Sequence, residues 1–551
     1  MGATPVRAWS PTQRDIDLCC VFRSTIIKAP YAMRSDSLVV VLAAAALLPA
    51  ASAMTTPAPK PNTNTAPALR NSRNAGLRIA AGAALGNILQ GFNTGVIGGA
   101  LLYIVPEFGL ETRPGVTGLI ASSTTMGAVM GTMACGKLLQ DFGRQRTLVI
   151  SCILFLIGGA LMGLAPDTSV LILGRVVGGM AAGLVSAAVP TYIAECAEPS
   201  QRGALSVLPQ LCVSSGILLS YLVGLSALLF GGSWRLMLGF SILPAIAQAC
   251  FVLTLPESPR WLLARRDDAA GARSALEQLR GTAVVDDEFA AMQAGLANER
   301  ARAAEAAGAA APAGGSAVGG GLLALVRNAD ARRALFVCSA LQLFQQFCGV
   351  NAIVYFTPQI LKQAGAPSLF LRWGVSTDAA AMLATVLAYL PKIPSVLLAT
   401  YLIDRKGRRW MLKAFVPPLA ACLALLAATV GASSGASATA LSAFGATMAV
   451  TLFGVFFGMS LGPLPNILSA ELFPTSVRGV GVATTTTVQW VSNMLVAALF
   501  PIAAATLGMT SVLWGFAGVC VLAYVVVVLF VPETKGVALE DIGGGGKGKK
   551  E

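Results

Sequence analysis

Histidine is absent from this 551-residue sequence, and charged residues make up only 12% of it. A soluble domain carries about 25% charged residues. The composition therefore argues against a soluble enzyme, a coiled coil and a disordered chain. Without histidine the chain has no Ser-His catalytic pair and no histidine metal ligand. We expect no enzyme, no cofactor and no metal site.

Cysteine pairs are also lacking. The 11 cysteines are scattered, mostly inside apolar runs, and only Cys19 and Cys20 are adjacent. No C-x-x-C metal motif and no disulfide framework can be recognised. Hydrophobic residues, by contrast, make up 55% of the chain. This excess indicates a protein whose solvent is mostly lipid.

Long apolar runs dominate the sequence after residue 75. A membrane-spanning helix needs about 20 mostly apolar residues. Twelve such runs lie at about 79–104, 116–139, 147–166, 169–194, 205–229, 235–255, 333–361, 378–403, 410–432, 441–469, 480–505 and 510–531. We predict an all-α membrane protein with twelve transmembrane helices in two six-helix bundles, 79–256 and 333–532. A polar insert at 257–332, with short helices and a Gly/Ala-rich linker, separates them, and a tail at 533–551 follows.

Lysine and arginine are concentrated in every second loop. Arg144 and Arg146 follow the second run, 405–409 follows the eighth, and the insert and the tail are also basic. The positive-inside rule places these loops, the insert and both ends of the twelve-helix body in the cytoplasm. This distribution explains the net charge of +13 without a nucleic-acid partner.

The first 78 residues have a different composition. An apolar stretch at 38–48 follows Met33 and Arg34 and precedes Ala51-Ser-Ala53, which is typical of a signal peptide. Residues 54–78 contain basic residues and no acid, as in a transit segment. The alternative is a disordered tail with one apolar patch. A targeting segment within 33–78 and the choice among plasma membrane, vacuole and plastid envelope stay open.

The two halves of the body repeat weakly. Glu195, Arg202 and Glu257 in the first half are matched, at one constant separation, by Glu471, Arg478 and Glu533 in the second. The stretch 141–146 similarly has a counterpart at 404–409. Internal duplication of this kind is typical of secondary transporters, which bind their substrate between the halves near the membrane midplane.

Seven motifs in order carry a resemblance to a known family. They are Gly91-Phe-Asn-Thr-Gly-Val-Ile-Gly98, Arg175 in Gly-Arg-Val-Val-Gly-Gly, Pro190-Thr-Tyr-Ile-Ala-Glu195 with Arg202, Pro256-Glu-Ser-Pro-Arg260, Gln345-Gln-Phe-Cys-Gly-Val-Asn351, Asp404 to Arg409, and Pro532-Glu-Thr-Lys-Gly536. The chain resembles the sugar porter family of the major facilitator superfamily over nearly all of 79–542. Stretches such as Leu208-Pro-Gln-Leu and Pro463-Leu-Pro-Asn-Ile-Leu468 are similar to the plant tonoplast monosaccharide transporter branch.

Neutral amides cluster in the apolar runs. Buried amides cost free energy unless they are paired, and they both donate and accept hydrogen bonds, which suits a polyhydroxyl ligand. Trp490 adds an apolar face for a pyranose ring. The alternative role is hydrogen bonding between helices. The expected substrate-binding residues are Gln210, Gln342, Gln345, Gln346, Asn351, Asn466, Gln489, Trp490, Asn493 and Lys392.

The resemblance also implies a gate and a charge network. The gate would consist of Tyr355 and Phe356. Acid–arginine pairs at the cytoplasmic helix ends would form when the inner side is closed. Some of these pairs would join the two halves. The desolvation cost of a pair between the halves nearly offsets the attraction of its charges, so the pair can form and break during a transport cycle. The expected members are Arg144, Arg175, Glu195, Arg202, Glu257, Arg260, Asp404, Arg408, Arg409, Glu471, Arg478 and Glu533.

Two residues depart from the usual pattern of the family. Proton-coupled members usually have a carboxylate in helix 1 where this chain has Asn93, and an amide carries no exchangeable proton near neutral pH. Facilitative hexose carriers also have asparagine there. Lys392 lies about 18 Å before the end of helix 8, near the membrane centre, where many sugar porters have a sugar-binding asparagine. A buried ammonium needs water, ligand or carbonyl groups unless it snorkels to an interface.

Together these features predict a transporter of monosaccharides, expected to be a hexose and in particular glucose, that works by alternating access. Asn93 favours uniport over proton coupling. The alternatives are a proton-coupled antiporter or symporter that uses Lys392, a carrier of an anionic sugar or organic acid, and a non-transporting sugar sensor. The expected partners are a monosaccharide and the lipid bilayer, with protons left open and a monomer as the functional unit.

Overall fold

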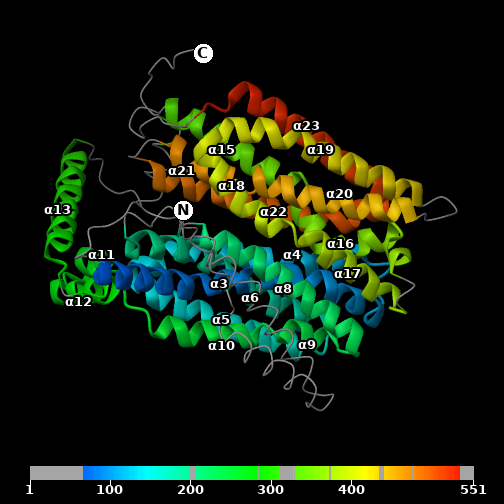
Figure 1. Cartoon of the computed structure of the whole chain (residues 1–551), viewed down its shortest axis with the longest axis horizontal. Coiled ribbons are helices and arrows are strands. Elements are labelled where there is room, and N and C mark those ends of the chain that lie inside the picture. Colours follow the sequence, from blue (N-terminus) through cyan, green and yellow to red (C-terminus); the bar gives the residue numbers. More distant parts are fainter. Residues whose placement is uncertain are drawn as a thin grey trace, which may run out of the picture. The chain divides into compact units, whose positions relative to one another are not determined.

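The structure is a computed structural model, and it describes residues 66–198, 205, 207–282, 284–309, 325, 327, 329–370, 374–433, 440–473 and 477–533. Residues 33–65 of the segment predicted for targeting therefore lie outside the described residues, and 66–78 form the start of the helix α3 (Ala66–Glu107). The described part is helical throughout, in agreement with the predicted fold class (Figure 1). Each predicted span is found as one helix or as two consecutive helices.

The first half contains five continuous spans and one broken span. The sixth predicted span is interrupted at Phe240 and Ser241, between a short helix and a longer one. The helices are α3 (Ala66–Glu107), α4 (Pro114–Asp141), α5 (Arg144–Gly163), α6 (Thr168–Cys196), α8 (Leu208–Phe230), α9 (Trp234–Gly239) and α10 (Ile242–Leu253).

The second half has more interruptions. Three of its six predicted spans are each divided into two helices. The elements are α15 (Ala329–Phe347), α16 (Val350–Gln363), η2 (Ala366–Leu369), α17 (Thr377–Tyr389), α18 (Lys392–Lys406), α19 (Arg408–Ser433), α20 (Ala440–Met459), α21 (Leu464–Leu472), α22 (Arg478–Leu507) and α23 (Met509–Phe530).

The break between α15 and α16 has a clear local cause. Gly349 adopts φ 82°, a left-handed conformation that glycine tolerates without strain. A Cβ atom at this position would also lie 2.3 Å from the ring of Phe516 on α23. Both the backbone angle and the close approach of the ring therefore require glycine here. The break exposes backbone carbonyl and amide groups inside the bundle, where irregular backbone is tolerated only beside polar partners or a cavity.

Eleven spans among the described residues are long and apolar enough to cross a membrane. The predicted span at 116–139 is also helical, as α4, but is not among those eleven. It is rich in small and hydroxyl residues, and four consecutive ones from Ser122 to Thr125 are buried. A Cβ at Gly127 would lie 2.0 Å from the Val176 carbonyl on α6. Small residues thus let α4 pack closely on α6.

In its described part, the insert forms three short helices and one helix of 24 residues, and part of it lies against the end of α6. They are α11 (Pro259–Trp261), η1 (Leu262–Arg266), α12 (Ala269–Arg280) and α13 (Asp286–Ala309). Arg280 is buried, donates to the Cys196 carbonyl over 2.9 Å and pairs with Glu288 at 2.6 Å. This arginine therefore ties α12 and α13 to the last residue of α6. The predicted Gly/Ala-rich linker lies almost entirely outside the described residues.

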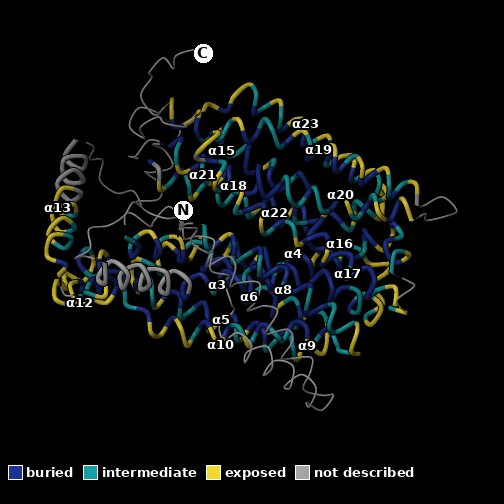
Figure 2. Tube along the Cα trace, in the orientation of Figure 1, coloured by how far each residue is buried: buried dark blue, intermediate teal, exposed yellow. Residues whose placement is uncertain are grey.

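The two halves contact each other at one end of their helices. A Cβ at Gly118, near the start of α4, would lie 2.2 Å from the Ala498 carbonyl, near the end of α22. On α8, Tyr221 donates its hydroxyl to the Val354 carbonyl of α16 over 2.8 Å. In the predicted orientation these contacts lie toward the outer side. Figure 2 shows buried residues along the central helices of both halves.

Candidate functional site

Gln345 lies at the centre of the amide cluster. Its Nε2 donates to the carbonyls of Leu461 and Gly462, over 2.7 and 2.8 Å, in the break between α20 and α21. Its Oε1 accepts from Gln346 at 3.0 Å and from Gln489 of α22 at 2.9 Å. These four bonds use the full capacity of the amide. Gln345 therefore joins three separate elements and has no free donor or acceptor in this conformation.

Other amides of the cluster keep unused acceptors. Gln342 donates to Asn466 of α21 over 2.8 Å, but its own Oε1 is buried and without a partner. Asn351 donates to the Oε1 of Gln346. Asn493 is buried, and its Oδ1 also lacks a partner. Unpaired buried oxygens are costly, so these two positions are suited to accept hydrogen bonds from a hydroxylated ligand.

Four residues predicted for the site stand apart from these bonds, namely Asn493 and Lys392 besides Gln210 and Trp490. Gln210 lies on α8, in the other half, is exposed and makes no hydrogen bond within the described part of the chain. Trp490 follows Gln489 on α22 and is half-buried. The hydrogen bonds thus form two sets of predicted amides: Gln342 with Asn466, and Gln345 with Gln346, Asn351 and Gln489.

The predicted gate residues are both buried on α16. The Tyr355 hydroxyl lies near the side chains of Thr125 and Asn493, which belong to different halves. The ring of Phe356 lies 5.0 Å from that of Phe500 on α22. Tyr355 thus lies between the two halves, whereas Phe356 packs within the second one.

The placement of Arg175 corrects one prediction. This residue was assigned to the cytoplasmic charge network, but it lies near the start of α6, about 30 Å along the helix from Glu195. It is 1% exposed and donates to the carbonyls of Ile120 and Ala121 over 2.7 and 3.3 Å. The helix begins beside the loop that lacks basic residues, so an arginine near its start lies at the end opposite to Glu195 and the other charges.

Asn93 occupies a buried position on α3, 2% exposed, and donates to the Leu89 carbonyl over 3.1 Å. A Cβ at Gly178, one turn after Arg175, would lie 3.9 Å from the Asn93 Oδ1. The two polar residues therefore occupy neighbouring positions on α3 and α6. None of the ion pairs between described residues includes Arg175.

Matching charge clusters close the predicted cytoplasmic ends of both halves. In the first, Arg144 pairs with Glu195 at 2.6 Å, and Glu257 accepts from the first amides of α5, including Arg144 N at 2.8 Å. In the second, Arg408 pairs with Glu471 at 2.8 Å, and Glu533 accepts from the first amides of α19 over 3.0 and 3.2 Å. The carboxylates thus cap helix N-termini in both halves.

These pairs differ from the predicted network in one respect. Each ion pair joins residues of the same half, and no pair between halves is present among the described residues. Arg409 donates to the Val528 carbonyl over 2.9 Å, and Arg260 lines a surface pocket together with Glu195. Three expected members have side chains that lie outside the described part, namely Arg202, Asp404 and Arg478.

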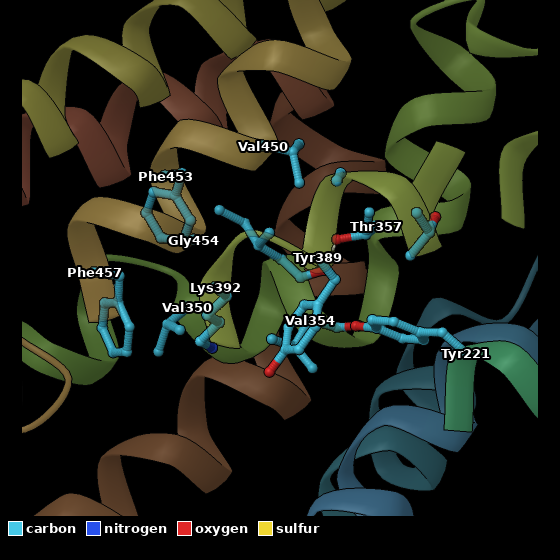
Figure 3. Close-up of a pocket in the computed structure, with 13 residues that line it drawn as sticks. Tyr221, Val350, Val354, Thr357, Tyr389, Lys392, Val450, Phe453, Gly454 and Phe457 are labelled. Carbon is cyan, nitrogen blue, oxygen red and sulfur yellow. Dashed lines mark hydrogen bonds between the residues drawn. The ribbon is translucent and has the colours of Figure 1, made fainter. Parts of the chain in front are cut away.

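Lys392 lies at the start of α18 and is 6% exposed. Its Nζ is 4.8 Å from the ring centre of Tyr389 and 5.5 Å from that of Phe457. It lines a cavity of about 20 Å³ between α8, α16, α17, α18 and α20 (Figure 3). The sequence did not point to two further polar residues that line this cavity, Tyr221 and Tyr389. Tyrosines in apolar runs were the available signal, because a buried hydroxyl usually finds a partner.

Comparison with known proteins agrees with this architecture. The family model described as "Sugar (and other) transporter" matches residues 79–544. The chain is 33% identical to the galactose-proton symporter of Escherichia coli, covering 84% of this chain and 92% of that protein. It is 32% identical to the plastidic glucose transporter 4 of Arabidopsis thaliana, covering 84% and 78% of the two chains.

A solved structure gives the same result for the fold. The partially occluded inward-open form of the xylose transporter XylE from E. coli superposes with a TM-score of 0.68 at 23% identity, covering 84% of this chain and all of that one. The family match spans both halves, and the described spans are membrane helices by length and composition. The chain therefore belongs to the sugar transporter family of the major facilitator superfamily, whose members are membrane transporters and not enzymes.

Proposed function

We propose that this protein carries a hexose, with glucose as the expected substrate, across a membrane by alternating access. The bonded amide cluster around Gln345 is the observation that carries the proposal. It joins α15, α22 and the break between α20 and α21, so movement of any of these elements alters the site. The unpaired oxygens of Gln342 and Asn493 accept hydroxyl groups of the sugar, and Trp490 contacts an apolar face of the ring.

Gln345 acts in this proposal through the other amides. Two of its four hydrogen bonds hold Gln346 and Gln489 in place, so Gln345 is a positioning residue. Gln210 contributes from the first half once the halves close around the ligand. Tyr355 and Phe356 form the gate, because Tyr355 lies between the two halves.

Uniport is the favoured mode of transport. Asn93 cannot exchange a proton near neutral pH, and the neighbouring Arg175 is held by carbonyl groups instead of a carboxylate. The similarity to a galactose-proton symporter supports the opposite view. In that alternative Lys392, which is buried in the second half, releases and rebinds the proton.

The remaining elements have supporting roles. We propose that the charge clusters at Arg144 and Arg408 hold the inner ends of each half rigid during the movement, because each pair lies within one half. We further propose a monomer as the functional unit. The plasma membrane, the vacuole and the plastid envelope are the three candidate locations, and a plastidic glucose transporter is among the relatives of this chain. A sugar sensor would bind glucose without moving it.

Uptake of labelled glucose into proteoliposomes, with and without a pH gradient, tests these proposals. Uniport predicts that glucose equilibrates and never accumulates, whatever the gradient. Lys392→Met, which keeps the volume and removes the charge, should then leave the flux insensitive to pH. Accumulation driven by the gradient and lost in Lys392→Met would make Lys392 the coupling residue. Binding of glucose with no uptake under any condition would indicate a sensor.

A further inference from the structure

The cavity beside Lys392 contains a positive charge without an acidic partner. No acidic side chain lines it, and no ion pair between described residues includes Lys392. The rings of Tyr389 and Phe457 face the ammonium at 4.8 and 5.5 Å. Cation–π attraction offsets only part of the cost of burying a charge. The ammonium therefore keeps unused hydrogen-bond donors.

The other polar groups of the cavity leave one further donor free. The hydroxyls of Thr357 and Thr385 donate to carbonyls of their own helices, and that of Tyr221 donates to the Val354 carbonyl. The Tyr389 hydroxyl is buried and makes no hydrogen bond within the described residues, and the Ser214 hydroxyl of α8, which also makes none, lies near it. In Figure 3 Lys392 and Tyr221 lie on opposite sides of Tyr389. The cavity thus offers an ammonium and a hydroxyl, the donor pair that suits a carboxylate.

This cavity adjoins the amide cluster. Its lining includes Val350, which precedes Asn351 on α16. Lys392 packs on the last turns of α20, because a Cβ at Gly458 would lie 3.9 Å from its Cγ. Leu461 and Gly462, whose carbonyls accept from Gln345, follow within one turn. A volume of about 20 Å³ holds roughly one water-sized group, so one substituent of a sugar fits there and a sugar ring does not.

We infer that the site binds an acidic hexose, such as a hexuronate, in preference to the neutral sugar. The ring hydroxyls lie at the amide cluster, and the carboxylate meets Lys392 and Tyr389. This inference rests on the proposed transport of hexoses and adds the substrate class. It predicts that the neutral sugar, which brings no charge to Lys392, binds less tightly.

Competition against labelled glucose uptake in proteoliposomes tests the inference, with glucuronate, unlabelled glucose and acetate as competitors. Glucuronate should inhibit at a concentration about tenfold lower than glucose does in the unaltered protein. Lys392→Asn should raise the half-inhibiting concentration of glucuronate more than tenfold, while that of glucose changes less. Tyr389→Phe should weaken glucuronate several-fold more than glucose. Lys413→Asn, a change of a lysine on α19 that does not line the cavity, serves as the matched control.

Several outcomes would overturn the inference. Equal inhibition by glucuronate and glucose, or an unchanged ratio in Lys392→Asn, would show that the lysine does not select a carboxylate. Inhibition by acetate as strong as that by glucuronate would assign the pocket to simple anions. Should Lys392→Asn fail to fold, Tyr389→Phe supplies the same comparison. Loss of the preference with intact glucose uptake refutes only this inference, whereas no uptake of either sugar refutes the proposed function.

Discussion

Gln345 makes more side-chain hydrogen bonds than its neighbours in the amide cluster. These bonds determine how a substitution of Gln345 should affect sugar binding. The amide satisfies two backbone carbonyls in a helix break and orients two glutamines. Buried carbonyls that lose their donor carry a desolvation cost of about 1–3 kcal/mol. The residue therefore affects sugar binding through the arrangement of other groups.

Gln345→Ala should weaken glucose binding by about 1–3 kcal/mol, because Gln346 and Gln489 lose their shared acceptor. Half-saturation for uptake in proteoliposomes is the measurement. Asn351→Ala should have a smaller effect, since Asn351 makes a single side-chain bond in this network. Gln363→Ala, at an exposed glutamine of α16, is the control. Unchanged half-saturation in both site variants would refute the assignment of the amide cluster.

At the scale of elements, the interruptions in the second half position the site. The break between α20 and α21 presents the Leu461 and Gly462 carbonyls to Gln345. The break between α17 and α18 is followed directly by Lys392. The break between α15 and α16 occurs at Gly349, between Gln346 and Asn351. Continuous helices would bond these carbonyls internally and would remove the partners that the site uses.

Gly349→Ala should destabilise the protein by about 1–3 kcal/mol, because the added methyl meets the Phe516 ring in a conformation with φ 82°. Glucose transport should fall together with the stability, since the helix break positions Asn351. Thermal unfolding in detergent and glucose uptake are the two measurements. The control is Gly515→Ala on α23, where a Cβ meets nothing within 4 Å. Equal melting temperatures for the two variants would contradict the role given to the break.

For the whole molecule, contacts between the halves select the conformation. The described contacts lie toward the outer side, as between Gly118 and Ala498, while the ion pairs at the inner ends stay within each half. In the predicted orientation, the conformation therefore has its outer side closed. Any bond made only between the halves stabilises this state relative to the other.

Tyr221→Phe removes one such bond, from its hydroxyl to the Val354 carbonyl, and keeps the ring that packs 5.3 Å from Tyr389. Losing a bond worth about 1 kcal/mol should shift the equilibrium roughly fivefold toward the outward-open state. Labelling of cysteines introduced at the outer ends of α4 and α22 would measure the shift.

The matched control for this shift is Tyr192→Phe. The Tyr192 hydroxyl donates to the Pro256 carbonyl over 2.7 Å. Both residues belong to the first half, so this bond does not join the two halves. Destabilisation without a change in labelling is therefore expected for Tyr192→Phe. Equal labelling of the outer ends in Tyr221→Phe and in the unaltered protein would argue against a conformational role for Tyr221.

The fold could be predicted because lipid imposes it on the sequence. Twelve apolar runs, the polar insert and the repeated acid–arginine motifs are local patterns, and backbone groups in lipid must be satisfied within helices. The same patterns identified the amides, since a buried amide stands out in an apolar run. Ion pairs within each half, such as Arg144 with Glu195, could also be predicted, because the residues that form them lie in motifs that occur in both halves of the sequence.

Other features required the tertiary structure. Arg175 binds the carbonyls of α4 far from the other charges, and only the packing of α6 on α4 reveals that partner. Gln345 is saturated while Gln342 is not, which depends on where the breaks place carbonyl groups. The pocket of Lys392 collects side chains from five helices. Composition and periodicity describe one helix at a time, whereas these properties depend on distances between helices that are remote in the sequence.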